Sequence, residues 1–234
     1  MIRDSAGFSR RKSGTFSAGF VSVRRGKPGL SLMSVPACLI LAELMIRKEI
    51  MKGHHLILGD LTDFLTGETL QDTHDEQQKQ KLARLLVEQK GYSKEEISPR
   101  CDLFIRTSEH KALVKVDFKI TLDDRVGMII KYGPGSLVTR QRLALAASRL
   151  LTSHMVPIVV VSNGEDADIM DGVSGKVIAS GLDSVPSKTE LAAHAEGFSF
   201  DPISEKRAKM ESLIVYAFEI DGSCPCDDTV CRLE

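Results

Sequence analysis

The chain has 234 residues, of which 42% are hydrophobic and 27% are charged, enough for one substantial core with or without appendages. Residues 1–30 hold seven Lys or Arg and one acid, so the remaining 24 bases and 31 acids give the rest of the chain a formal charge of −7. This acidic balance argues against a tight, autonomous DNA-binding protein. The five unevenly spaced cysteines argue against a disulfide framework and indicate a reducing cytoplasm.

Residues 1–44 have no helix or strand periodicity, and they contain an apolar run from Leu30 to Ala42 that Pro36 interrupts. The run is too short to span a membrane comfortably. Basic residues before an apolar segment are typical of a signal or transit peptide. The alternative, which we prefer, is upstream sequence read from an early start codon, with Met45 or Met51 as the natural start. We therefore expect a disordered leader or mis-called start at 1–44, a domain at 45–221 and no membrane association.

The chain that follows alternates helical and strand patterns. The sequence first predicts a short helix from its cap at Asp60 to Phe64 and a long helix from Thr73 or Asp75 to Lys90. Two strands around Asp102 and Asp117 follow, and then a strand at 128–132, a helix at 137–153 and a strand at 158–161. A hairpin-like segment punctuated at 163–164 and 172–175 comes next, and the chain closes with one helix after Ser187 and another from Asp201-Pro202 to about Phe218. The predicted fold is α/β, with a central mixed β-sheet of four or five strands flanked by helices.

The strands around Asp102 and Asp117 carry the chemistry. Alternate residues from Ala112 to Ile120 are apolar, which is typical of a half-buried strand. If Glu109 and His110 form a two-residue turn, Asp102 lies opposite Asp117 and the apolar face pairs with itself. The two carboxylates would then be roughly 4.5–5.5 Å apart at Cβ, a spacing that suits one divalent cation.

Asp102, Asp117 and the Phe118 carbonyl are thus candidate ligands for Mg²⁺ or Mn²⁺, cations that prefer oxygen. Lys119 lies on the same face as Asp117 and could orient or deprotonate the attacking water. An acid-x-Lys sequence on an amphipathic strand is also compatible with an ordinary solvated face. The residues at the start of the next helix have basic or hydroxyl groups that suit a phosphate, unless they are simply surface residues: Ser136, Arg140 and Arg142.

The order Asp102, a fourteen-residue gap, then Asp117-x-Lys119 resembles the PD-(D/E)xK nuclease motif. The helical run from His74 to Ile97, with its Gly-Tyr-x-Lys-Glu-x-Ile ending, resembles the N-terminal domain of type I restriction enzyme R subunits. The strand and Asn-Gly turn at 157–164 resemble the same domain. This resemblance covers about 75–181 and implies a restriction-endonuclease-like fold. It also implies that Glu76, the helix acid, serves as a catalytic and metal-binding residue, although Glu76 would equally suit a first-turn acid favoured by the helix dipole.

Three features depart from that family. Asp117 stands where the R subunits more often have Glu, and Gln141 is followed by Leu145 where they commonly have Tyr. No Gly-x-x-x-x-Gly-Lys-[Ser/Thr] phosphate loop occurs in the sequence, so it contains no ATP-driven translocase motor of that type. The resemblance is to the nuclease-like domain alone.

The sequence ends in a Cys-rich tail at 222–234, with Cys224, Cys226 and Cys231. Three thiolates could ligate Zn²⁺ or part of an iron–sulfur cluster, but a fourth ligand is missing and the Cys-x-Cys spacing is unusual for zinc. We expect a reduced tail rather than a metal site.

The sequence therefore predicts a cytoplasmic, Mg²⁺- or Mn²⁺-dependent DNA endonuclease, a hydrolase of phosphodiester bonds. Its expected partners are DNA and a separate helicase or specificity subunit. The alternative is a non-catalytic interaction or nucleic-acid-binding module of the same fold. The two differ in geometry, because a catalytic site requires Asp102, Asp117 and Lys119 to converge where solvent can reach them.

Overall fold

The computed structural model describes residues 57–220 and 230–233, so the predicted leader, the side chains of the C-terminal cysteines and most of the tail lie outside the described residues. The described elements are, in chain order, β1 (Ile57–Thr62), β2 (Thr69–Thr73), α2 (His74–Arg84), η1 (Leu85–Gln89), η2 (Lys94–Glu96), β3 (Ile97–Arg106), β4 (Lys111–Leu122), β5 (Arg125–Tyr132), α3 (Val138–Leu151), β6 (Ile158–Ser162), β7 (Ala167–Asp171), β8 (Val177–Ser180), η3 (Leu182–Ser184), α4 (Lys188–Glu196), α5 (Glu205–Val215), η4 (Tyr216–Ile220) and β9 (Val230–Leu233).

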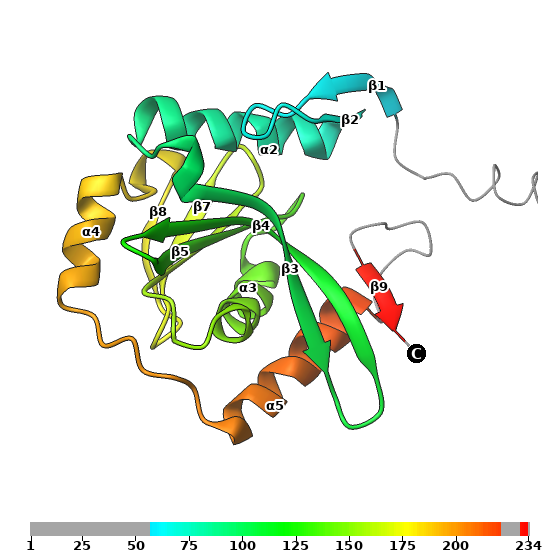
Figure 1. Ribbon diagram of the computed structural model, residues 1–234, viewed down its shortest axis with the longest axis vertical. Helices are drawn as coiled ribbons and strands as arrows, with labels where there is room; N and C mark the ends of the chain where they lie inside the picture. The colour runs from blue at the N-terminus through cyan, green and yellow to red at the C-terminus, as the bar shows by residue number, and fades with distance from the viewer. Residues whose placement is uncertain (1–56, 221–229, 234) are drawn as a thin grey trace, which may run out of the picture. The chain divides into compact units, whose positions relative to one another are not determined.

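The main sheet of the described residues has the strand order β3-β4-β5-β6-β7-β8, and β9 pairs with β4 (Figure 1). Only β5 and β6 are parallel among these pairs, and α3 connects them, as a parallel crossover requires. The predicted mixed α/β fold is confirmed. The sheet has seven strands rather than four or five, because the hairpin-like segment forms β7 and β8, and β9 adds to β4.

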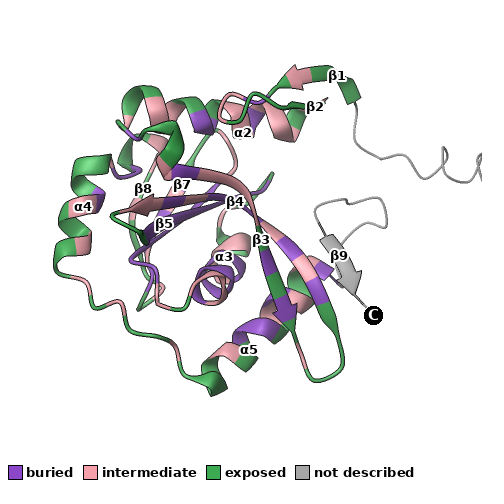
Figure 2. Ribbon diagram, in the orientation of Figure 1, coloured by how far each residue is buried: buried purple, intermediate pink, exposed green. Residues whose placement is uncertain are grey.

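Helices cover both faces of this sheet. Side chains of α3 and α5 share one core cluster with Ile129, Val159 and Val161, whereas side chains of α2 and α4 share a second cluster with Ile130 and Val160. Successive residues of one strand point to opposite faces, so the sheet separates the two clusters. Burial on both faces explains why the run at β6 is continuously apolar (Figure 2).

Most predicted helices form where their caps indicate. Thr73 accepts a hydrogen bond from the Glu76 amide and begins α2, and Ser187 forms a capping box with Glu190 at the start of α4. The predicted start of the last helix at Asp201 is wrong. The Asp201 carbonyl instead accepts a hydrogen bond from the Met155 amide at 2.9 Å, and Ser204 caps α5.

The predicted helix after Asp60 is also wrong, because this segment forms β1 of a two-stranded hairpin. Asp63, whose residue is only 2% exposed, accepts hydrogen bonds from the Leu65 and Thr66 amides and so organises the turn between β1 and β2. This local bonding favours a turn over a helix at these residues.

Candidate site around Asp117

The β3–β4 hairpin has a longer turn than the sequence predicted. The Thr107 amide donates to the His110 carbonyl at 2.8 Å, and the Thr107 hydroxyl accepts from the His110 amide at 2.9 Å. Arg106 then pairs with Lys111, so residues 107–110 form the turn instead of Glu109 and His110 alone. Asp102 consequently lies opposite Lys115, and the predicted pairing of Asp102 with Asp117 is wrong.

A register shift of two residues explains why the apolar pattern did not reveal this error. Shifting a strand by one residue moves every side chain to the other face, but shifting it by two leaves each on its original face. Leu103 pairs with Val114 and Ile105 with Ala112, so the apolar face is still continuous. The hydrogen bonds of the turn, rather than hydrophobicity, choose between these two registers.

Asp102 is therefore a surface residue. Its carboxylate lies 3.2 Å from the Lys115 ammonium, and the side chains are 58% and 37% exposed. Exposed ion pairs of this kind contribute little to stability. We expect Asp102→Ala to change the free energy of unfolding by less than about 1 kcal/mol, measured by urea denaturation. A larger loss would mean that Asp102 has a partner beyond Lys115.

Asp117 is instead almost buried, with 8% of the residue exposed. Its carboxylate lies 3.1 Å from the Lys79 ammonium of α2 and accepts a hydrogen bond from the Tyr132 amide at 2.8 Å. The Tyr132 hydroxyl donates to Asp75 at 3.1 Å. These contacts connect the middle of β4 to the first two turns of α2 and to the end of β5.

Lys79 is the centre of this site. Burial alone would lower the pKa of its ammonium, but the charges of Asp117 first, and then of Glu76 and Asp75, outweigh burial and hold that pKa above its usual value. Its side chain is 17% exposed and lies 5.8 Å from the centre of the Tyr132 ring. Sequence reasoning missed Lys79, whose only signal was its position three residues after Glu76 on the same helix.

A strand irregularity places Asp117 on this side of the sheet. Arg100 lies between the pairs Pro99–Phe118 and Cys101–Val116, opposite Asp117, and has a φ of +50°. The apolar residues of β4 also change cluster here, because Val116 packs in the cluster of α3 and α5 and Phe118 in that of α2 and α4. Irregularities of this kind re-aim side chains and recur next to functional sites.

Arg100 extends this polar region to the β1–β2 hairpin. Its guanidinium contacts Asp63 at 2.5 Å and Glu68 at 3.3 Å, and its nearest nitrogen is 4.0 Å from Glu76. The Glu76 carboxylate also accepts a hydrogen bond from Gln80 at 2.9 Å. Glu76 lies in the first turn of α2, as its interpretation as an acid favoured by the helix dipole requires, and its role as a metal ligand stays a prediction.

The remaining predicted residues lie elsewhere. Lys119 pairs with Ser98 and is close enough to Cys101 to oppose the rise in that thiol's pKa, which burial causes. Arg140 donates to the Pro134 carbonyl at 3.2 Å, and Arg142 lies 2.6 Å from Glu211 of α5. Ser136 is exposed in the loop before α3. The structure pairs Asp102 with Lys115 instead of Asp117, so it does not bring Asp102, Asp117 and Lys119 together as predicted.

Both oxygens of Asp117 have a partner within the described residues, because one lies 3.1 Å from the Lys79 ammonium and the other accepts from the Tyr132 amide. In the described part of the chain, no three His, Cys, Asp or Glu side chains are grouped so as to hold a metal ion. No helix within 57–220 is both long and apolar enough to cross a membrane.

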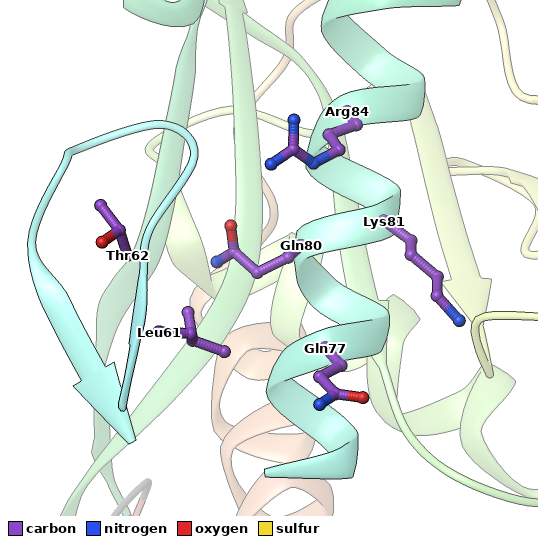
Figure 3. Close-up of a pocket in the computed structure, with 6 residues that line it drawn as sticks. All are labelled: Leu61, Thr62, Gln77, Gln80, Lys81 and Arg84. Carbon is purple, nitrogen blue, oxygen red and sulfur yellow. The ribbon is translucent and has the colours of Figure 1, made fainter. Parts of the chain in front are cut away.

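A shallow groove lies beside this site, between the β1–β2 hairpin and α2, with a volume of about 300 Å³ (Figure 3). Gln80 points across it, and its carbonyl accepts from the Phe64 amide at 2.7 Å. None of the predicted site residues lines the groove, whose walls are Leu61, Thr62, Gln77, Gln80, Lys81 and Arg84.

Comparison with known proteins supports the predicted resemblance. Residues 74–186 match the family model described as type I restriction enzyme R protein N terminus (HSDR_N). No curated protein and no solved structure matches the chain. The match includes Glu76, Lys79, Asp117 and Tyr132, and it ends before α4 and α5. Over residues 74–186, slightly less than half of the chain, the sequence is therefore similar to the type I restriction enzyme R protein N terminus.

Proposed function

We propose that this chain is a non-catalytic member of its family, an interaction module in which an internal ion pair replaces a metal centre. The observation that carries the proposal is the contact between Lys79 and Asp117, 3.1 Å apart with side chains 17% and 10% exposed. The ammonium neutralises the carboxylate that would otherwise bind a cation. A lysine can supply positive charge at this position, but it offers no open coordination site for water or phosphate.

The neighbouring strand supports the same proposal. Lys131 lies on β5, the strand that pairs with β4 next to Asp117. The Lys131 ammonium contacts Glu219 at 2.7 Å and donates to the Lys115 carbonyl at 2.9 Å. The Lys131 ammonium is thus paired with Glu219 of η4, so it is not available to activate a water beside Asp117.

The partner of such a module is proposed to be a protein, such as a separate helicase or specificity subunit. Residues 31–234 carry a formal charge of −7, which disfavours strong binding to phosphates. Of the phosphate candidates, Arg142 is already paired with Glu211, and Arg140 donates to the Pro134 carbonyl. Any DNA binding is expected to be weak and to fall steeply with added salt, which fluorescence anisotropy at several salt concentrations would measure.

A metal-dependent DNA endonuclease is the second candidate function. The observation in its favour is that Asp75, Glu76 and Asp117 all act electrostatically on Lys79, so displacement of this one ammonium would leave Asp117 without its counter-charge. Mg²⁺ or Mn²⁺ would then supply Lewis acidity at that position.

A nuclease assay separates the two functions. We expect no cleavage of single-stranded, duplex or branched DNA by the wild-type protein with either Mg²⁺ or Mn²⁺, because Asp117 is neutralised by Lys79. Metal-dependent cleavage that Asp117→Asn abolishes would instead establish the nuclease and refute the non-catalytic proposal. Cleavage that persists in Asp117→Asn would identify a contaminating enzyme, which repurification of both proteins would remove.

A further inference from the structure

A second pocket, of about 460 Å³, lies between the end of α3, the turn after β7 and the segment that leads into α5. This volume is in the range of small-molecule sites. One part of its wall is apolar and the other is basic. The lining residues are Arg149, Met155, Val173, Pro202, Ile203, Ser204, Lys206, Arg207 and Met210.

The basic part surrounds a single buried carboxylate. Glu211 of α5 is fully buried and accepts from Arg207 at 2.6 Å and from Arg149 at 2.8 Å, and its second oxygen lies 2.6 Å from Arg142. Three guanidinium groups therefore share one negative charge. Burial, together with the charges of Arg207 and Arg142, lowers the pKa of Arg149 in spite of its bond to Glu211. The cluster therefore holds more positive than negative charge.

The donors that remain free lie on α5. Arg207 uses its Nε on Glu211, and its two terminal nitrogens make no hydrogen bond to any described residue. Lys206 makes no ion pair within the described part of the chain, and its side chain lines the pocket. Arg149, in contrast, is 5% exposed and is held by Glu211 and by the Val173 carbonyl at 2.9 Å. Arg149 therefore forms part of the fixed wall, and Lys206 and Arg207 are the groups that can bind a ligand.

We propose that this pocket binds a small organic phosphate with a flat apolar ring, with the phosphate at Lys206 and Arg207 and the ring against Met155 and Met210. A guanidinium fork and an ammonium suit phosphate oxygens, and the excess positive charge favours a phosphate monoester, with about two negative charges, over a carboxylate with one. Methionine side chains pack well against aromatic rings. The site is separate from Asp117, and Lys206 and Arg207 lie outside the matched family segment.

Isothermal titration calorimetry at constant ionic strength tests this site with adenosine monophosphate, adenosine and inorganic phosphate as probes. We expect adenosine monophosphate to bind more tightly than either of the other two. Lys206→Glu should weaken its binding about tenfold or more, because a charge-assisted contact becomes a repulsion. Met210→Ala should weaken binding of adenosine monophosphate and leave that of inorganic phosphate unchanged. Both side chains are exposed, so both variants should fold.

Lys209→Glu is the matched control, because Lys209 is exposed on the same helix but does not line the pocket. Its affinity for adenosine monophosphate should stay within about twofold of wild type, since it changes only the screened long-range field. Absence of binding at millimolar adenosine monophosphate would overturn the proposal. So would equal affinity for inorganic phosphate, which needs no ring, or an equal loss in Lys209→Glu, which would indicate non-specific attraction.

Discussion

Lys79→Met is expected to destabilise the protein by about 3–5 kcal/mol, because it leaves the Asp117 carboxylate almost buried without its counter-charge. The loss of the ammonium also exposes Asp117 to the charges of Glu76 and Asp75, which the lysine now offsets. Methionine retains most of the volume and helix propensity of lysine, so the change tests charge more than packing. Urea denaturation of the variant and the wild type measures the difference.

Two further variants show that the effect belongs to the ion pair. Lys79→Met combined with Asp117→Asn should recover most of the lost stability, because no buried charge remains. Arg84→Met on the same helix removes an exposed pair with Glu88 and a contact with the Phe64 ring at 4.5 Å, and it should cost less than about 1.5 kcal/mol. If Lys79→Met were no more harmful than Arg84→Met, the carboxylate would have to be solvated or neutralised by another group.

Metal titration of the same variant connects stability to function. The thermal midpoint of the wild type should not respond to Mg²⁺, whereas that of Lys79→Met should rise with Mg²⁺ concentration, because a cation can then neutralise the unpaired Asp117 carboxylate and stabilise the fold by mass action. A rise in the wild type that Asp117→Asn removes would favour the nuclease.

The raised pKa of Lys79 also sets a pH window for the stability of the fold. The stabilisation that charged Lys79 gives to the folded state is complete below the usual lysine pKa, and it is lost as the pH rises through the higher folded-state pKa.

Glu211→Gln is expected to have an effect of similar size, about 3–5 kcal/mol, because it leaves three arginines around a buried neutral amide. Glu205→Gln is the matched control, since Glu205 is exposed at the start of the same helix, and it should cost less than about 1 kcal/mol. Thermal and urea unfolding of both variants would measure these differences. Equal stability of the two variants would mean that the arginines separate without cost when Glu211 is neutral.

The pH dependence of Glu211 has the opposite sign to that of Lys79. Burial would raise the pKa of Glu211, but its bonds to Arg207, Arg142 and Arg149 outweigh burial and lower it. A lowered carboxyl pKa stabilises the fold fully above the usual value of about 4.5, and this stabilisation is lost as the pH falls through the lower folded-state value. The stability difference between wild type and Glu211→Gln should therefore be largest near neutral pH and shrink in acid.

Residues 74–186 show how much local sequence determined. The caps of α2 and α4 and the apolar run of β6 depend on neighbouring residues, and these elements formed as predicted. The strand β4 also formed, but its predicted single apolar face divides between the two core clusters after Val116. The α/β class follows from their order along the chain. The proximity of Glu76 and Asp117 to Lys79 was not predicted, and their predicted roles as metal ligands stay a prediction.

Only the tertiary structure decided which groups meet. The choice between two hairpin registers with the same apolar face depended on hydrogen bonds at Thr107, and the shift moved Asp102 away from Asp117. Lys79 and Asp117 are separated by 37 intervening residues and join only when α2 packs on the sheet. Periodicity records which side of an element is buried, but it carries no information about which buried charges become partners, because that depends on contacts between elements distant in the sequence.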